Sequence, residues 1–172
     1  MTKHDLLSRA IPLSQLAGSS THFVVNQGFG AYLKLGFDTD SYNDRYAYAH
    51  EGNRDGDERY AWVITPLGGD MYSFQNASNT GGFLFEGDQA DGDGDHRIRG
   101  HNTSNIVGSK GDRYKFKVLP VDGGGNIYHI QTVSGDIMKA GYSRDDDGDY
   151  GVYGQPKNDD GDRYQWIIVP VP

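Results

Sequence analysis

Cysteine is absent from this 172-residue sequence, which excludes disulfides and thiolate metal sites. Long apolar runs are absent too. The first twenty residues lack the apolar stretch of a secretory signal peptide, and no later segment approaches the length of a transmembrane helix. We therefore expect a protein that does not insert into membranes and is either cytoplasmic or released without a signal peptide.

Positive charge is also scarce, because 16 lysines and arginines face 24 aspartates and glutamates, for a net charge of −8. This balance argues against nucleic acid as a partner, although it also serves ordinary solubility. Glycine is abundant instead, with 25 of 172 residues, about twice the ~7% of an average protein. The length suits one domain, and the composition predicts short strands joined by many turns.

One pattern occurs three times in the sequence: an acidic turn, Arg-Tyr, an aromatic residue, an aliphatic run and a proline. It occupies residues 56–67, 111–121 and 159–172. The tyrosines of this pattern are 54 and 50 residues apart, and so are its prolines; they are Tyr60, Tyr114 and Tyr164, and Pro66, Pro120 and Pro170. A period of this length indicates one structural unit used three times.

Three further segments per repeat have the alternating or continuous apolar pattern of half-buried strands. The first set is 22–26, 71–76 and 127–131, the second is 31–37, 82–88 and 136–142, and the third is 45–50, 96–101 and 150–155. With the Arg-Tyr strand this makes four strands per repeat and twelve in all. Residues 1–20 stand apart as an N-terminal arm, with a short helix interrupted at Pro12.

Three copies are too few for a propeller, which needs at least four blades. A β-trefoil, a six-stranded barrel capped by three hairpins, fits both the strand count and the repeat length. We therefore predict an all-β protein with one β-trefoil domain over 21–172 and repeats at 21–69, 70–125 and 126–172. The residues expected to plug the barrel are Trp62, Phe116 and Trp166.

The sequence resembles the β-trefoil lectin superfamily, and Tyr164-Gln165-Trp166 is similar to the Gln-x-Trp signature of ricin-type members. The resemblance implies carbohydrate binding. The aspartate of ricin-type sugar sites, however, falls near three residues that are not acidic, so sugar contacts cannot be transferred from that family. These residues are Lys34, Phe85 and Lys139. Other trefoil groups, such as protease inhibitors and the targeting subunits of toxins, remain alternatives.

Aspartate-rich turns at 91–95, 145–149 and 159–162 resemble calcium loops. An EF-hand loop needs glycine at its sixth position and glutamate at its twelfth, whereas the loop from Asp91 has His96 and Asn102 there. We favour a role in tight hairpin turns and leave a looser calcium cage as an alternative. An Asp-Arg pair before each barrel strand, at Arg59, Arg113 and Arg163, is interpreted as a brace for the turn.

The third strand of each repeat carries the polar groups that a sugar site needs: carboxylates, amides, histidines and aromatic rings. The candidate sugar-binding residues are Asp44, Tyr48, His50 and Asn53 in repeat one, Asp95, Arg99, His101 and Asn102 in repeat two, and Asp149, Tyr153, Gln155 and Asn158 in repeat three. Such residues also suit the solvent face of any soluble hairpin. The functional interpretation is a multivalent lectin that binds glycans or glycoproteins.

Enzymatic chemistry has little support, since the sequence has no motif that pairs a nucleophile with a base or binds a catalytic metal or phosphate. We expect no enzymatic activity and no cofactor. The rival hypothesis is a protein-binding trefoil, and its candidate recognition loop is His101 to Lys110, which is longer than its counterparts. The N-terminal arm could also mediate self-association into a homo-oligomer.

Overall fold

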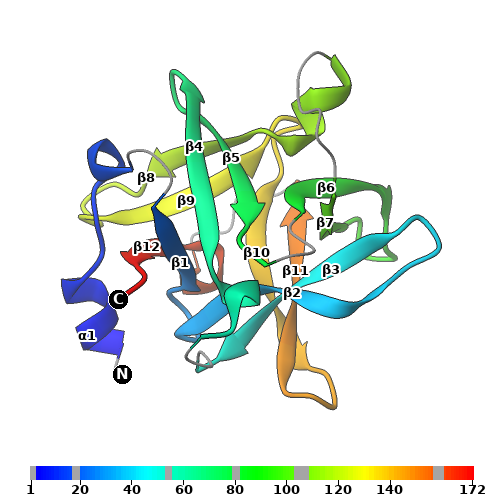
Figure 1. The fold of residues 1–172 in the computed structure, drawn as a ribbon, viewed down its shortest axis with the longest axis horizontal. Helices are drawn as coiled ribbons and strands as arrows, with labels where there is room; N and C mark the ends of the chain where they lie inside the picture. The colour runs from blue at the N-terminus through cyan, green and yellow to red at the C-terminus, as the bar shows by residue number, and fades with distance from the viewer. Residues whose placement is uncertain (1–2, 17–19, 53–55, 79–81, 103–108, 157–160) are drawn as a thin grey trace.

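The computed structural model describes residues 3–16, 20–52, 56–78, 82–102, 109–156 and 161–172 (Figure 1). Its twelve strands form three groups of four, as the sequence predicts. Repeat one holds β1 (Thr21–Asn26), β2 (Ala31–Thr39), β3 (Asp44–Glu51) and β4 (Trp62–Gly68). Repeat two holds β5 (Met71–Asn76), β6 (Phe83–Ala90), β7 (His96–His101) and β8 (Phe116–Pro120). Repeat three holds β9 (Ile127–Thr132), β10 (Ile137–Arg144), β11 (Asp149–Gln155) and β12 (Trp166–Pro170).

Six strands close into a barrel. The first and fourth strands of the repeats pair in the order β1–β4–β5–β8–β9–β12, and β12 returns to β1. Every pairing is antiparallel. The barrel therefore leaves no open edge among these strands, which removes the usual risk of edge-to-edge pairing.

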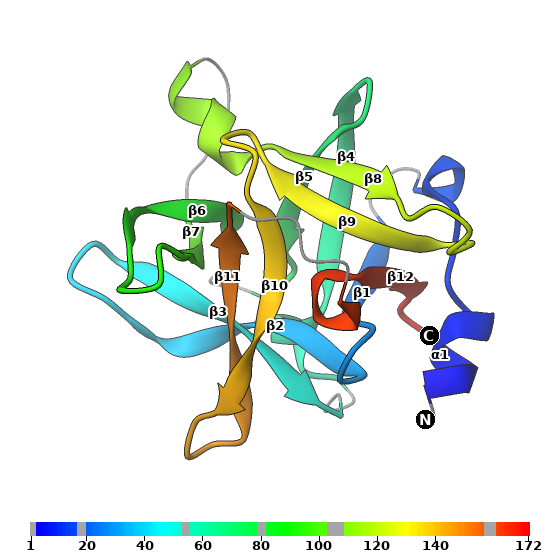
Figure 2. The same cartoon turned by 180° about the vertical axis from the view of Figure 1, so that it is seen from behind.

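The other six strands form three hairpins, β2–β3, β6–β7 and β10–β11, which meet at one end of the barrel (Figure 2). Their second strands also pair with one another, β3 with β7, β7 with β11 and β11 with β3, so that they close a triangle. Each hairpin contains a register shift at the equivalent place. Short 3-10 turns precede the barrel strands: η2 (Glu58–Tyr60), η3 (Ser109–Tyr114) and η4 (Asp162–Tyr164).

The three predicted plug residues are all completely buried in the main core: Trp62, Phe116 and Trp166. The two tryptophans also satisfy their indole N–H groups, since Trp62 Nε1 donates to the Leu33 carbonyl and Trp166 Nε1 to the Met138 carbonyl, both at 2.9 Å. These bonds tie the barrel to the second strand of the same repeat, because a buried indole needs an acceptor.

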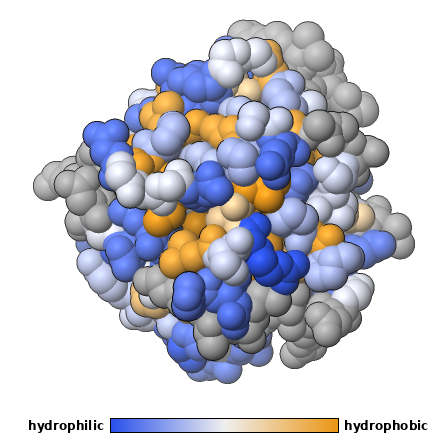
Figure 3. Space-filling view, turned by 90° about the vertical axis from the view of Figure 1, so that its left-hand side faces the viewer, coloured by the Kyte–Doolittle hydropathy of each residue, from blue (hydrophilic) through white to orange (hydrophobic). Residues whose placement is uncertain are grey.

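The N-terminal arm lies against the barrel beside β12 (Figure 1). It holds α1 (Lys3–Ser8) and η1 (Leu13–Gln15). Leu6 packs in a small apolar cluster with Ile167 and Val169, and Leu16 joins the main core. On the face that carries the arm, apolar side chains form small groups separated by polar ones (Figure 3). Among the described residues, no helix is long and apolar enough to span a membrane.

Candidate functional site

Each outer hairpin ends in an acidic turn whose first aspartate binds the backbone of the turn. In repeat two, Oδ1 of Asp91 accepts the backbone N–H groups of Asp93 and Asp95 at 2.9 and 3.0 Å. The same two bonds form in the other hairpins, with Asp40 and Asp145 as acceptors. These side chains act as turn caps, which explains why aspartate recurs at this position.

The fourth residue of each turn has a positive φ, 63° at Asn43 and 81° at Gly94 and Gly148, a conformation that glycine and asparagine tolerate best. Together with the capping bonds, this supports turn formation as the role of the aspartates. Calcium would need several of their oxygens to converge on one point, whereas one oxygen of each capping aspartate faces amide hydrogens. Asp159 and Asp160, in the third acidic stretch, lie outside the described residues.

The last aspartate of each turn is buried and reaches into the next repeat. Asp149 of repeat three contacts repeat one, with Oδ2 at 2.6 Å from Lys34 Nζ and Oδ1 at 2.5 Å from His50 Nδ1. Asp44 of repeat one binds His101 Nδ1 of repeat two at 2.5 Å. Asp95 of repeat two pairs with Lys139 of repeat three. From the sequence, each aspartate was assigned to the same binding site as the strand that follows it. In the structure it belongs to the site of the next repeat, because antiparallel pairing of β3, β7 and β11 places each turn beside that repeat.

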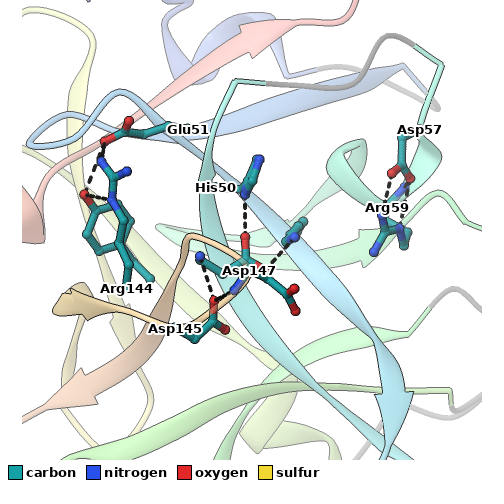
Figure 4. A network of polar contacts seen from close by, with 10 residues as sticks. His50, Glu51, Asp57, Arg59, Arg144, Asp145 and Asp147 are labelled. Carbon is teal, nitrogen blue, oxygen red and sulfur yellow. Dashed lines mark hydrogen bonds and ion pairs between the residues drawn. The ribbon is translucent and has the colours of Figure 1, made fainter.

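This arrangement creates three equivalent pockets, each named for the repeat that supplies its hairpin. The repeat-one pocket, of about 320 Å³, is lined by β2, β3, η2 and the acidic turn of repeat three. Figure 4 shows His50 of β3 beside the turn residues Asp145 and Asp147, and Arg59 held by Asp57. The principal side chains of this pocket are Lys34, Phe37, Tyr48, His50, Arg59, Asp147 and Asp149.

The repeat-two pocket, of about 600 Å³, is the largest of the three. Here Phe85 stands where the other repeats have lysine. Arg99 supplies the missing cation, with Nη1 at 2.7 Å from Asp40 Oδ2 and at 3.9 Å from Asp44 Oδ2. Other lining residues are Tyr42, Asp88, His101, Arg113 and Tyr114.

The repeat-three pocket, of about 430 Å³, takes its acidic wall from the turn of repeat two. Lys139 Nζ bridges Asp95 of that turn to Gln155 Oε1 of β11. Gln155 Oε1 also accepts the hydroxyl of Tyr164 at 2.5 Å. The remaining principal residues are Asp93, Tyr142, Tyr153 and Arg163. All three volumes fall in the range of about 300–1,000 Å³ that small-molecule sites occupy.

In each pocket an exposed aromatic ring and an exposed acid occupy two equivalent positions, one on the hairpin and one on the neighbouring turn, and repeat two exchanges them. In repeats one and three the hairpin supplies the ring and the neighbouring turn supplies the acid. In repeat two the hairpin supplies the acid and the neighbouring turn supplies the ring. The pairs are Phe37 with Asp147, Tyr142 with Asp93, and Tyr42 with Asp88. The rings of Phe37, Tyr42 and Tyr142 are 70%, 76% and 74% exposed, although burial is the norm for such side chains.

Arginines from the 3-10 turns hold two of these rings in place. The guanidinium of Arg59 lies 3.4 Å from the ring centre of Phe37, and that of Arg163 lies 3.4 Å from Tyr142. Buried asparagines fix these turns, since Asn76 Nδ2 donates to the Arg59 carbonyl and Asn26 Nδ2 to the Arg163 carbonyl. Stacking of this kind orients the ring without covering its outer face.

The Asp-Arg brace predicted for each repeat forms as a bidentate pair in repeat one, where Asp57 binds Arg59 through both oxygens. Repeat two differs, because Arg113 Nη1 lies 3.5 Å from Asp88 and Asp112 pairs with Lys115. In repeat three Arg163 donates to the Ala140 carbonyl and the Tyr164 hydroxyl. These arginines are therefore also pocket residues, a role that the sequence analysis did not assign.

Nine of the twelve predicted binding residues line the pockets: Asp44, Tyr48, His50, Asp95, Arg99, His101, Asp149, Tyr153 and Gln155. Asn102 is exposed and does not line the repeat-two pocket. Asn53 and Asn158 lie outside the described residues, as does most of the rival loop, His101 to Lys110. The exposed rings were not among the predicted residues, although aligned positions of the repeats carry a ring in one copy and an acid in another.

The pockets contain carboxyl and phenol groups with shifted pKa values. Burial opposes the shift at Asp40, but backbone N–H donors from Asp44 and Tyr42 and the charge of Arg99 lower the pKa of its carboxyl. Burial raises the pKa of Tyr48 and Tyr114, with the charges of nearby arginines opposing it. Asp40 therefore stays an anionic hydrogen-bond acceptor and the two tyrosines stay neutral donors near neutral pH.

Solved structures share this architecture. The chain is similar to a Culex salivary protein of the Cysteine and Tryptophan-Rich family, with a TM-score of 0.70 and 18% identity over 90% of this chain and 95% of that one. It is also similar to ThreeFoil, a designed threefold-symmetric protein, with a TM-score of 0.65 and 18% identity over 88% of this chain and 99% of that one. It is similar as well to the BEL beta-trefoil, with a TM-score of 0.64 and 13% identity over 94% of this chain and 100% of that one. No protein-family model and no curated protein matches the sequence. At these identities the likeness shows the fold alone: the chain is a β-trefoil protein.

Proposed function

We propose that this protein is a multivalent lectin that binds glycans in its three pockets without covalent chemistry. The observation that carries the proposal is that an exposed aromatic ring, an exposed acid and further polar side chains line each pocket together. A pyranose ring has an apolar C–H face and a rim of hydroxyl groups. An aromatic ring covers the first, and carboxylate, amide and imidazole groups bind the second.

The acidic groups of the pockets suit recognition better than catalysis. Asp149 is engaged by Lys34 and His50, and Asp95 by Lys139. Glycoside hydrolysis needs two carboxyl groups that are free to reach the scissile bond, one as acid and one as nucleophile or base, whereas these two carboxylates are taken up by cations of the pocket. The same ion pairs hold the pocket floor in place before any ligand arrives.

Multivalency supplies the affinity that one shallow pocket lacks. Three sites on one rigid body raise the local concentration of each site for a branched or surface-bound glycan, with gains of roughly 10²–10⁴ over a single site. The β-trefoil fold is shared by lectins, carbohydrate-binding modules and protease inhibitors, so the pockets, and not the fold, distinguish this proposal from its rivals.

Glycan-array binding of the wild type and of aromatic variants tests the proposal. A stacking ring contributes about 0.5–1.5 kcal/mol, so Phe37→Ala, Tyr42→Ala or Tyr142→Ala should weaken glycan binding in its own pocket roughly two- to tenfold. The triple variant should lose binding to every glycan that the wild type binds. Since all three side chains are largely exposed, we expect the variants to remain folded.

Leu67→Ala is the matched control, because Leu67 is also an exposed apolar residue, 40% accessible, but lies in the β4–β5 hairpin outside the pockets. It should bind like the wild type. A wild type that binds no glycan, or a triple variant that binds as well as the wild type, contradicts the proposal.

A further inference from the structure

Three potential metal ligands converge at a place outside the three pockets. Glu86 comes from β6, His96 from the start of β7, and Asp136 from the residue before β10. His96 Nδ1 lies 2.9 Å from Asp136 Oδ2 and 3.8 Å from Glu86 Oε1. Each residue offers one ligand atom, and these atoms all lie within 4.8 Å of one another.

The cluster breaks the threefold symmetry of the molecule. By strand register, Glu86 corresponds to the buried Leu35 in repeat one and the buried Ala140 in repeat three. The two other equivalent places hold no such ligands; they carry Leu35, Arg45 and Gly82, and Ala140, Tyr150 and Ala31. An ionisable side chain that replaces a core aliphatic one costs stability unless a partner compensates, so this exchange calls for a partner.

One ligand oxygen has no partner. Oε1 of Glu86 is buried and receives no hydrogen bond from the described residues. Gly154 leaves the space that this carboxylate occupies, because a Cβ on Gly154 would lie 2.4 Å from Glu86 Oε1 and 3.2 Å from the Cβ of Asp136. Buried acceptors are rarely left without a donor or a cation, and this one lies 3.8 Å from the imidazole nitrogen of His96.

Neighbouring hydroxyl groups hold the Glu86 carboxylate and the backbone of Asp136. Ser134 Oγ donates to Glu86 Oε2 at 2.6 Å and shares a hydrogen bond with Thr132 Oγ1 at 2.7 Å. Thr132 Oγ1 in turn accepts the backbone N–H of Asp136. A bond to a ligand carboxylate, such as that of Ser134, is characteristic of protein metal sites, because it fixes the direction of the ligand atoms.

We infer that Glu86, His96 and Asp136 bind one divalent transition-metal ion of the zinc type. Ligand atoms about 2.0–2.1 Å from a tetrahedral Zn²⁺ are about 3.3 Å apart, which falls between the 2.9 and 3.8 Å found here. An imidazole with two carboxylates suits zinc better than calcium or magnesium, which prefer six or more oxygens. Three protein ligands leave a fourth position for water or another ligand.

The ion would join two repeats. A dication would neutralise the charge of both carboxylates and accept the lone pair of His96 Nδ1. Because Glu86 and His96 belong to repeat two and Asp136 to repeat three, the ion would link the two. His96, which is 29% exposed, gives the ion a route from solvent.

Zinc titration of untagged, chelator-treated protein tests this site. Calorimetry at neutral pH should show one Zn²⁺ per chain, and zinc should raise the melting temperature, whereas Ca²⁺ and Mg²⁺ should do neither. Two variants remove a ligand: His96→Gln, and Glu86→Leu, which installs the residue found at the equivalent place in repeat one. Each should weaken zinc binding by more than roughly 100-fold.

Glu86→Leu also keeps the test decisive if His96→Gln folds poorly, because a leucine already fits this position in repeat one. His4→Gln, on α1, is the matched control and should bind zinc like the wild type. A wild type that binds no zinc, or variants that bind it unchanged, would overturn the inference. Since no cluster residue lines a pocket, glycan binding and zinc binding succeed or fail separately.

Discussion

Single residues show how the three repeats keep a similar pocket with different side chains. Positions 34, 85 and 139 hold Lys, Phe and Lys, so repeat two lacks the cation that binds the buried aspartate elsewhere. Arg99 replaces a tyrosine in the same repeat and restores that cation beside Asp40 and Asp44. In the sequence, repeat two looks like the copy that departs most from the others, but Arg99 compensates for the missing lysine.

His22 makes stability depend on pH. The side chain is 3% exposed, and burial lowers its pKa below the ordinary 6.5, with a backbone hydrogen bond at Ser20 opposing the shift. Below pH 6.5 the unfolded chain therefore binds a proton that the folded chain resists. The free energy of unfolding should fall in this range by up to about 1 kcal/mol per pH unit.

Urea denaturation of the wild type and of His22→Gln, measured from pH 8 to pH 5, isolates this contribution from that of the other histidines. The difference in unfolding free energy between the two proteins should be constant above the ordinary pKa of histidine. It should then shift in favour of the variant as the pH falls. A difference that is the same at every pH would rule out His22 as the source.

At the scale of elements, each acidic turn is stabilised by the hydrogen bonds of its first aspartate and not by the binding of a cation to its charges. Asp91→Ala removes the acceptor of two backbone N–H groups and should destabilise the protein by about 1–2 kcal/mol. Asp93→Ala, two residues away and exposed, should change stability by no more than about 0.5 kcal/mol. Thermal denaturation with and without Ca²⁺ measures both effects. Equal losses, or a melting temperature that rises with Ca²⁺ only when Asp91 is present, would favour a calcium loop instead.

The hairpin triangle explains a second departure from symmetry. The equivalent positions 46, 97 and 151 hold Tyr, Arg and Gly. Arg97 lies among the rings of Tyr46, Tyr48 and Tyr153, with distances of 5.1, 4.8 and 4.7 Å to their centres. A Cβ on Gly151 would lie 2.1 Å from Arg97 Nη1. Where β3, β7 and β11 meet, the side chain of Arg97 fills the central space. The equivalent positions in the other two repeats therefore cannot also hold an arginine.

At the scale of the whole molecule, the fold could be predicted from the sequence because the repeats carry it redundantly. Each of the twelve strands was marked by apolar periodicity and by its counterparts in two other repeats. The plugs Trp62, Phe116 and Trp166 followed from the same alignment and are completely buried. Redundancy of this kind makes the local and global signals agree.

The composition of the sites was harder to predict, because it depends on contacts between repeats. No spacing along the chain indicates that Asp149 meets His50, which is 99 residues away. The exposed rings carry only part of a repeat signal, since Phe37 and Tyr142 are equivalent but Tyr42 occupies a different position. Likewise, Glu86 and Asp136 meet only because the fold brings the start of β10 close to β6.

The N-terminal arm yields a last prediction, because it stabilises the whole barrel while lining none of the three pockets. Leu6 and Leu16 are 3% and 4% exposed, and the Ile11 N–H donates to the Ile168 carbonyl of β12. Deleting residues 1–16 should cost roughly 3–6 kcal/mol, since each buried leucine contributes about 1.5–3 kcal/mol. Deleting residues 1–9 should cost about half as much, because Leu16 remains in the main core.

Urea denaturation measures both deletions, and glycan binding below the unfolding transition provides the control. If the arm only stabilises the barrel, both truncated proteins bind like the wild type wherever they are folded. Loss of binding by a folded truncated protein would show instead that the arm contributes to recognition or to assembly. Unchanged stability in both would show that the contacts of Leu6 and Leu16 with the barrel are not formed in solution.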